Sequence, residues 1–231
     1  MNLELQPPPG LLAVRNDSVS QLVIESIRTA IVTQALPPGS RLTESGLASQ
    51  LNVSKTPVRE ALITLREIGI IEPDGRRGDR VVRPSRKTLQ HAYDAREALE
   101  IFLVRQAAET ASTEQIERMK VAAARSLEGA HGGDATMFRE GDADFHEAIR
   151  VSDNKQLNKM IDNIFTLIIT LRQRDAPDKV VSIRCGEDHV AIAAAIEARN
   201  PDEAEKVIRS HIRYIAANVL ANMDLADPAS Q

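Results

Sequence analysis

The sequence predicts a mainly α-helical chain in two parts, with three helices and a small β-hairpin followed by an all-α bundle of about six helices. Two observations support this fold class. Apolar residues recur at helical spacing over most of the 231 residues. Strand-like apolar runs occur only between residues 70 and 83, on either side of a glycine-containing loop. Aromatic residues make up 3% of the chain and tryptophan is absent, so leucine, isoleucine, valine and alanine must form the cores.

The first part of the predicted fold ends near residue 83. Residues 1–16 show no helical periodicity and lack the basic and apolar regions of a secretion signal, so we interpret them as a disordered lead-in. Pro37-Pro38-Gly39 ends the first helix, and Ser54 is a suitable N-cap for the third. The predicted elements are helices at 18–33, 44–51 and 54–68, strands at 70–72 and 80–83, and a hairpin loop at 73–79.

The second part of the predicted fold is helical throughout. Residues 84–87 form the predicted linker, and residues 225–231 a short tail. Ser112 and Gln115 have the spacing of a capping box, and Asn200-Pro201-Asp202-Glu203 combines a cap, a proline and an acidic first turn. The six predicted helices fill a domain of residues 88–224 and span 88–110, 113–128, 134–151, 155–174, 180–199 and 201–223.

Composition narrows the class of protein. No apolar run approaches the ~18 residues of a membrane-spanning helix. The single cysteine, Cys185, cannot form an internal disulfide, so we expect a cytoplasmic protein and interpret Cys185 as an ordinary helical thiol. The net charge of −4 is uneven: residues 1–86 carry 11 basic and 9 acidic side chains (+2), and residues 87–231 carry 18 and 24 (−6). This modest positive excess favours an anionic partner for the first part without establishing one.

The order helix, helix, turn, helix, hairpin is that of a winged helix-turn-helix. Within it stand two specifically spaced segments, Leu36-Pro-Pro-Gly-Ser-Arg-Leu-Thr-Glu44 and Leu51-Asn-Val-Ser-Lys-Thr-Pro-Val-Arg-Glu-Ala-Leu62. Over residues 17–83 the chain therefore resembles the N-terminal domain of GntR-type transcriptional regulators. The resemblance implies that the third helix enters the major groove of double-stranded operator DNA and that the hairpin wing reaches the minor groove.

The resemblance also implies a set of DNA-binding residues. The N-terminus of the third helix offers free N–H groups to a phosphate or base edge, and Arg59 is placed to reach a guanine. The chain departs from many family members at Ser45-Gly46, where they have Arg-Glu, and at Lys55, where they have arginine, so the family does not define its operator. The predicted DNA-binding residues are Arg41, Ser54, Lys55, Thr56, Arg59 and the wing residues Arg76 and Arg77.

Three of the five histidines have an informative spacing. Asp142 and His146 stand four residues apart on one predicted helix, so they share a face and can chelate one ion. His189 and His211 lie on the last two predicted helices. One carboxylate and three imidazoles suit Zn²⁺, Ni²⁺ or a similar borderline cation. On spacing alone, surface or core histidines remain the commoner interpretation.

The pattern Asp-x-x-Phe-His146, then Glu-x-His189, then a late histidine resembles the FCD ligand-binding domain, the partner of GntR domains in the FadR subfamily. The resemblance covers about residues 88–224. It implies that the domain holds a divalent metal, zinc in the first instance, with nickel or another transition metal as the alternative. The implied metal ligands are Asp142, His146, His189 and His211.

The same resemblance implies a homodimer that senses a small organic acid, whose carboxylate completes the metal shell. We expect Arg96 to bind this effector; the alternative is an intrahelical ion pair with Glu100. The chain is thus predicted to be a regulator, in the simplest case a repressor, and not an enzyme.

Three alternatives stay open at this stage. The metal could be structural and closed to ligands, or the metal itself could be the signal. A helical metalloenzyme is the weakest alternative, because its only candidate base, Glu147, points away from the face that carries His146. It also leaves the first 83 residues without a role.

Overall fold

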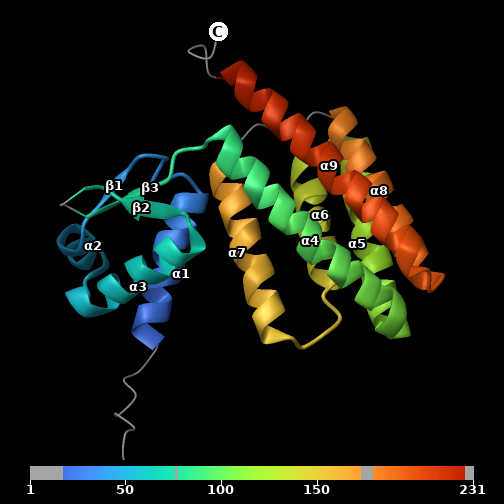
Figure 1. The fold of residues 1–231 in the computed structure, drawn as a ribbon, viewed down its shortest axis with the longest axis horizontal. Helices are drawn as coiled ribbons and strands as arrows, with labels where there is room; N and C mark the ends of the chain where they lie inside the picture. The colour runs from blue at the N-terminus through green and yellow to red at the C-terminus, as the bar shows by residue number, and fades with distance from the viewer. Residues whose placement is uncertain (1–17, 76–77, 173–178, 227–231) are drawn as a thin grey trace, which may run out of the picture. The chain divides into compact units, whose positions relative to one another are not determined.

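The computed structural model describes residues 18–75, 78–172 and 179–226. The chain divides into two compact units, the first ending at Val82 and the second beginning at Arg83. In Figure 1 the first unit consists of three helices and a small sheet, and the second of helices. This architecture confirms the predicted fold class. None of the described helices is both long and apolar enough to cross a membrane.

The first unit contains α1 (Ser18–Val32), α2 (Glu44–Leu51), α3 (Lys55–Ile68), β1 (Arg41–Leu42), β2 (Ile71–Pro73) and β3 (Asp79–Val81). Local sequence explains where α2 begins and ends. The Thr43 hydroxyl accepts a hydrogen bond from the Gly46 N–H at its start, and Asn52 takes the left-handed conformation at its end. One face of α3 is apolar at helical spacing and packs against α1.

The sheet of the first unit has the strand order β1-β3-β2, with antiparallel pairs. The predicted hairpin corresponds to β2 and β3, in which Ile71 pairs with Val81. The sequence prediction lacks β1, because a strand of two residues with only Leu42 buried has no alternation to detect. Pairing of β1 with β3 places Arg41 opposite Arg80.

The second unit is a bundle of long helices. In it α5 packs against α6 and α8, α4 against α7 and α9, and α8 against α9. Figure 1 shows α4 (green) running alongside α9 (red). The helices are α4 (Arg86–Thr110), α5 (Thr113–Gly132), α6 (Ala135–Ala148), α7 (Lys155–Leu171), α8 (Lys179–Glu197) and α9 (Pro201–Ala226).

Two helix ends differ from the prediction for identifiable reasons. Helix α4 begins at Arg86, inside the predicted linker, because the Ser85 hydroxyl accepts a hydrogen bond from the Thr88 N–H and caps it. Helix α5 continues to Gly132 because Gly133, with a φ of 73°, supplies the left-handed residue that ends it.

Two glycines bring α6 and α8 close to α5. A Cβ on Gly186 of α8 would lie 2.7 Å from the Cα of Leu127, and one on Gly141 of α6 would overlap the backbone of Ser126. Any larger residue would push the helices apart. Backbone packing therefore holds α6 and α8 against adjacent residues of α5.

Candidate functional site

A cluster of polar side chains is buried in the second unit, where apolar packing is the rule. Such groups are rarely buried unless they pair with each other or with a ligand. These side chains come from four helices. They are Arg96 and Glu100 of α4, His146 of α6, His189 of α8 and His211 of α9, all at most 4% exposed.

The four predicted metal ligands converge in this cluster. The ring nitrogens of His146, His189 and His211 that face one another lie within 4.8 Å. Oδ1 of Asp142 lies 3.9 Å from Nε2 of His146 and 3.7 Å from Nε2 of His189. The spacing of Asp142 and His146 predicts their shared face correctly, and packing of α8 and α9 adds the other two histidines.

Each of the three imidazoles has a neighbour at its Nδ1 atom. Nδ1 of His189 lies 3.1 Å from Oγ of Ser126, and Nδ1 of His211 lies 3.4 Å from a carboxylate oxygen of Asp188. Nδ1 of His146 lies 3.1 Å from Oε1 of Glu100, off the line of a good hydrogen bond. A partner at Nδ1 orients the ring and leaves Nε2 for a ligand, as in metal-binding histidines.

Burial sets the charge of two of these histidines. It lowers the pKa of His189 well below the ordinary value, and the nearby positive charges lower it further. Burial also lowers the pKa of His211, although its contact with Asp188 opposes the shift. Both rings are therefore neutral at pH 7, which is the form that binds a metal.

Arg96 forms the ion pair that the sequence offers as one alternative, and its guanidinium also reaches the histidines. Its Nε lies 3.2 Å from Oε1 of Glu100, so the intrahelical ion pair forms. Its Nη2 lies 2.8 Å from Nε2 of His146, so the guanidinium also enters the cluster, and Phe165 covers its face at 4.6 Å. Burial alone would raise the pKa of Glu100, but Arg96 and His146 lower that pKa to about 2.

Cys185 is the residue that the sequence interpretation misses. It is a buried thiol on α8, with Sγ 3.4 Å from Oδ1 of Asp142 and 3.7 Å from Nε2 of His189. Burial, reinforced by Asp142, raises the pKa of the thiol well above its usual value. One signal was available: Cys185 and His189 stand four residues apart, the same spacing as Asp142 and His146.

Two nearby carboxylates remain outside the cluster, as their helical phase predicts. Asp144 is exposed and pairs with Arg125 at 3.1 Å, and Glu147 pairs with Arg150 at 3.0 Å. Both carboxylates are exposed and pair with arginines outside the cluster. Asp144 therefore offers a matched control for Asp142 on the same helix.

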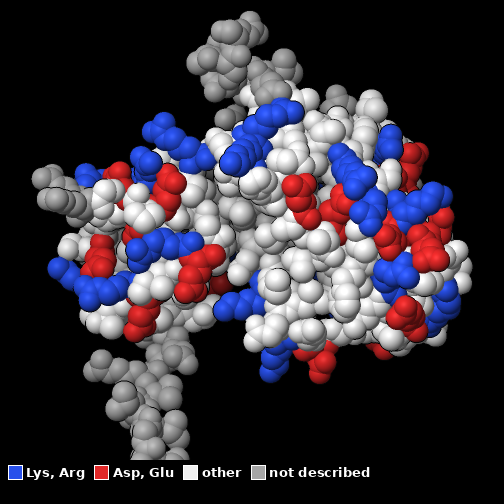
Figure 2. All heavy atoms as spheres, viewed as in Figure 1, with Lys and Arg blue, Asp and Glu red and all other residues white. Residues whose placement is uncertain are grey.

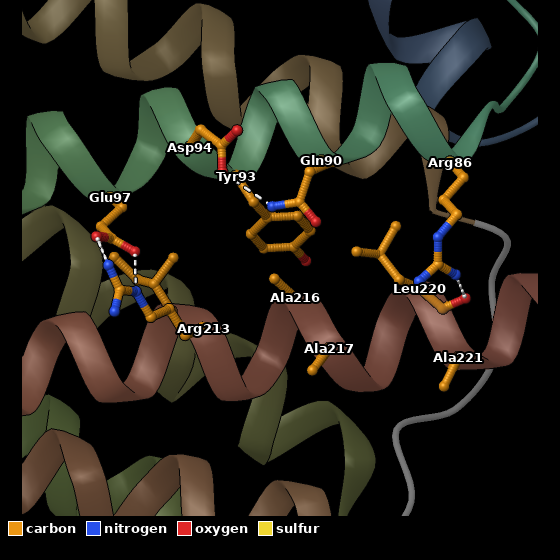
Figure 3. A pocket seen from close by; sticks show the side chains of 11 residues that line it. Arg86, Gln90, Tyr93, Asp94, Glu97, Arg213, Ala216, Ala217, Leu220 and Ala221 are labelled. Carbon is orange, nitrogen blue, oxygen red and sulfur yellow. Dashed lines mark hydrogen bonds and ion pairs between the residues drawn. The ribbon is translucent and has the colours of Figure 1, made fainter.

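A cleft of about 550 Å³ lies between α4 and α9. Figure 3 shows the Tyr93 ring extending from α4 toward Ala216 of α9, with the Glu97–Arg213 ion pair to one side. The Tyr93 hydroxyl is buried and has no hydrogen-bond partner among the described residues. The ring also lies 6.0 Å from the guanidinium carbon of Arg96, so Tyr93 stands between the cleft and the cluster.

In the first unit, the N-terminus of α3 is open to solvent. Ser54 is the N-cap, as predicted, but its hydroxyl makes no capping hydrogen bond. Lys55 and Thr56 in the first turn are exposed. The first N–H groups of α3 thus have no side-chain cap at Ser54, which suits an anion.

Two other predicted DNA-binding arginines pair with carboxylates. Arg59 makes a two-pronged contact with Glu44, both bonds 2.8 Å long, and its side chain is 63% exposed. Arg41 lies 3.6 Å from Asp74. The predicted wing residues Arg76 and Arg77 lie outside the described residues. On the face of this unit shown in Figure 2, basic and acidic side chains are interspersed, in keeping with its small net charge.

Two family profiles match the chain over the two units. The profile described as "Bacterial regulatory proteins, gntR family" matches residues 19–81. The profile described as "FCD domain" matches residues 91–214.

Several relatives are similar over most of their length. A probable D-xylose utilization operon transcriptional repressor of Paenarthrobacter nicotinovorans is 30% identical over 92% of this chain and 95% of its own. The repressor RspR of Escherichia coli K12 is 25% identical over 87% of this chain and 89% of its own. The repressor NanR of Citrobacter rodentium is 26% identical over 86% of this chain and 84% of its own.

Solved structures share the fold. E. coli McbR/YncC superposes with a TM-score of 0.72 at 20% identity, over 92% of this chain and all of that one. A putative GntR regulator from Rhodococcus sp. RHA1 superposes with a TM-score of 0.68 at 22% identity, over 88% and 98%.

Proposed function

The chain belongs to the GntR family of bacterial regulatory proteins and is a DNA-binding transcriptional regulator with an FCD domain; on this premise we propose that it is a dimeric repressor controlled by a small organic acid bound at a metal. One observation carries the proposal: three buried histidines, the partly exposed Asp142 and Arg96 lie close together in the second unit. Repression is supported by the relatives, which are described as repressors.

The residues of the cluster fit a divalent metal. Neutral imidazoles oriented through Nδ1, with a carboxylate beside them, are the donor set of zinc and similar cations. The fully buried Glu100 also has one carboxylate oxygen, Oε2, without a hydrogen-bond partner among the described residues. A buried polar group in this state indicates that the cluster is completed by something else. Asp142, His146, His189 and His211 would hold the ion, which would supply a Lewis-acidic position for a carboxylate.

Arg96 is suited to recognise the acid. Nε2 of His146 has one lone pair, which Arg96 and a metal cannot both use. With a metal on His146, the Nη2 donor of Arg96 is left for a carboxylate, while Glu100 still fixes the guanidinium through Nε. Arg96 does not line the cleft, so an acid that enters there would reach this arginine only after the Tyr93 ring moves aside.

In the first unit, we propose that the N-terminus of α3 contacts operator DNA. The free N–H groups beside Ser54, with Lys55 and Thr56, are suited to phosphates, and Arg59 to a guanine. A phosphate or base must compete with Glu44 for Arg59, so this contact forms by exchange of one anionic partner for another. An effector that favours one state of the dimer then shifts the fraction able to bind DNA.

The metal is tested by comparing Asp142→Asn with Asp144→Asn in the full chain. We expect the first variant to lose bound metal, measured by elemental analysis after dialysis against zinc, and the second to retain it. Equal metal content in the two variants would refute the assignment of Asp142.

The effector is tested by thermal-shift measurements against a panel of small carboxylic acids, before and after chelator treatment. We expect one acid to raise the melting temperature only of the metal-loaded protein and to release a DNA fragment from the protein's own upstream region. Stabilisation that survives chelation would place the acid away from the metal. Release of DNA by metal alone would make the metal the signal.

A structural metal gives a different result again. In that case His189→Ala would unfold the second unit, as measured by circular dichroism, whereas a regulatory metal site leaves a folded variant that binds DNA without responding to the acid.

A further inference from the structure

The thiol of Cys185 lies in the same cluster as the proposed metal ligands. Cys185 precedes His189 by four residues on α8, as Asp142 precedes His146 on α6, so two helices each present a pair of donors one turn apart. The chain has no other cysteine.

The distances around Sγ are those of donors that share one ion. Sγ lies 3.4 Å from Oδ1 of Asp142 and 3.7 Å from Nε2 of His189. Metal–sulfur and metal–nitrogen bonds of about 2.3 and 2.0 Å separate the two donor atoms by about 3.0 Å at the right angle of a six-coordinate ion and by about 3.5 Å at wider angles. The thiol therefore needs little movement to join the ion that Asp142 and His189 would hold.

A second observation, on the His146 side of the same cluster, points to a missing partner. The buried carboxylate of Glu100 contacts Arg96 and His146 through Oε1, while its Oε2 has no hydrogen-bond partner among the described residues. If the cluster held no metal and the Cys185 thiol only donated a hydrogen bond to Asp142, Oε2 of Glu100 would stay without a partner. Arg96 already offsets the charge of this carboxylate through Oε1, so what Oε2 lacks in the described part of the chain is a partner of its own, which a bound ion or its ligands would supply.

We propose that Cys185 is a fifth ligand of the metal, bound as a thiolate; this deepens the metal site of the proposed function and rests on it. On binding, the S–H bond breaks, the sulfur lone pair forms the metal–sulfur bond and the proton leaves to solvent. The resulting donor set of three nitrogens, one oxygen and one sulfur selects zinc, cobalt or other borderline cations over magnesium and calcium. In a six-coordinate ion, one position remains for the effector.

The experiment uses Co²⁺ as the probe, added to chelator-treated full-length protein. Ligand-field bands in the visible range report that cobalt binds, and a sulfur-to-cobalt charge-transfer band in the near ultraviolet reports thiolate ligation. Any such band must come from Cys185, because the chain has no other cysteine. We expect both bands in the natural protein, and only the visible bands in Cys185→Ser, which keeps a hydrogen-bond donor to Asp142.

The possible outcomes distinguish failure of Cys185 ligation from failure of the metal site itself. Visible bands without charge transfer in the natural protein would overturn ligation by Cys185 and leave the metal site standing. Absence of both bands would overturn both. Circular dichroism shows whether Cys185→Ser is folded; if it is not, the charge-transfer band and protection of the thiol from alkylation by added Co²⁺ decide the question in the natural protein.

Discussion

Each unit contains an arginine–glutamate pair, and the two pairs differ in their surroundings. Arg59 and Glu44 in the first unit meet in solvent, with side chains 63% and 34% exposed. Arg96 and Glu100 in the second unit are 5% and 0% exposed. Water and salt weaken the first pair, whereas the second has lost its hydration and depends on its partners.

The difference shows how one pair of residue types can serve two kinds of recognition. An exposed arginine can exchange Glu44 for a DNA phosphate or base at little cost. A buried arginine cannot leave Glu100, but it can offer its remaining donors to a small ligand that reaches it. The first unit is therefore suited to a large anionic partner and the second to a small one.

The largest expected effect comes from breaking the buried pair. Glu100→Gln leaves the charge of Arg96 buried without a carboxylate, so the free energy of unfolding of the second unit should fall by about 3–5 kcal/mol. Hydrogen exchange of the full chain measures this separately for the two units. Chelator-treated protein should be used, so that bound metal does not contribute.

Glu44→Gln is the matched control, because it makes the same change in the exposed pair and should leave stability nearly unaltered. The double variant Arg96→Met/Glu100→Leu should recover most of the stability lost in Glu100→Gln. Equal effects of Glu100→Gln and Glu44→Gln would show that burial does not distinguish the two pairs.

The exposed pair of Arg59 and Glu44 should affect DNA binding and not stability. Arg59→Ala is expected to weaken operator binding roughly ten- to hundredfold, the effect of losing one specific base contact. Glu44→Gln should strengthen binding, because it removes the competing carboxylate. Fluorescence anisotropy with a fragment of the upstream region measures both at fixed salt, and weaker binding by Glu44→Gln would contradict exchange at Arg59.

Lowering the pH should reduce the stability of the second unit and not that of the first. Burial holds the pKa of His189 well below its ordinary value in the folded state, so below about pH 6.5 the unfolded chain takes up a proton that the native chain does not. Stability of the metal-free second unit should therefore fall as the pH drops below that value, by up to about 1.4 kcal/mol per pH unit for this histidine.

The first unit should not lose stability over the same pH range. Burial there raises the pKa of Asp79, a shift whose stabilising contribution is present at low pH and lost as pH rises. Hydrogen exchange at pH 7 and pH 5.5 distinguishes the units, and the exposed His131→Gln serves as the control histidine. Parallel destabilisation of both units would remove His189 as the cause.

The smallest expected effect is at Arg41. If this exposed arginine contacts one phosphate, Arg41→Ala should weaken DNA binding only a few-fold and lower the slope of log affinity against log salt by about 0.9. An unchanged slope would assign Arg41 to contacts within the protein, such as that with Asp74.

Local patterns predict most of the fold but only part of the buried site. Caps and breakers such as Ser112 and Pro37-Pro38-Gly39 act within a few residues, so they can be recognised in the sequence. Strand β1 cannot be predicted from the sequence because its two residues form a strand only by pairing with β3. The face shared by Asp142 and His146 is likewise local, whereas the approach of His189 and His211 depends on helix packing.

Cys185 and Arg96 mark the limit of such arguments. A single cysteine is usually an inert core residue, and nothing in its neighbours along the chain says that α6 lies opposite. For Arg96, helical spacing offers Glu100 as a partner but is silent about His146, fifty residues away. In both cases the missing information is a tertiary contact.

The contacts that Gly141 and Gly186 make with α5 set the spacing of the helices around the buried cluster, whereas the donor side chains set its chemistry. Gly141 precedes Asp142, and Gly186 follows Cys185, so backbone against backbone fixes how far apart these two donors begin. In the proposed metal site, exchanging one donor for another at position 142 or 185 would therefore change which cation is preferred without changing the spacing of the helices. A methyl group at Gly141 or Gly186, which touches no donor, would instead change that spacing and disturb every ligand at once.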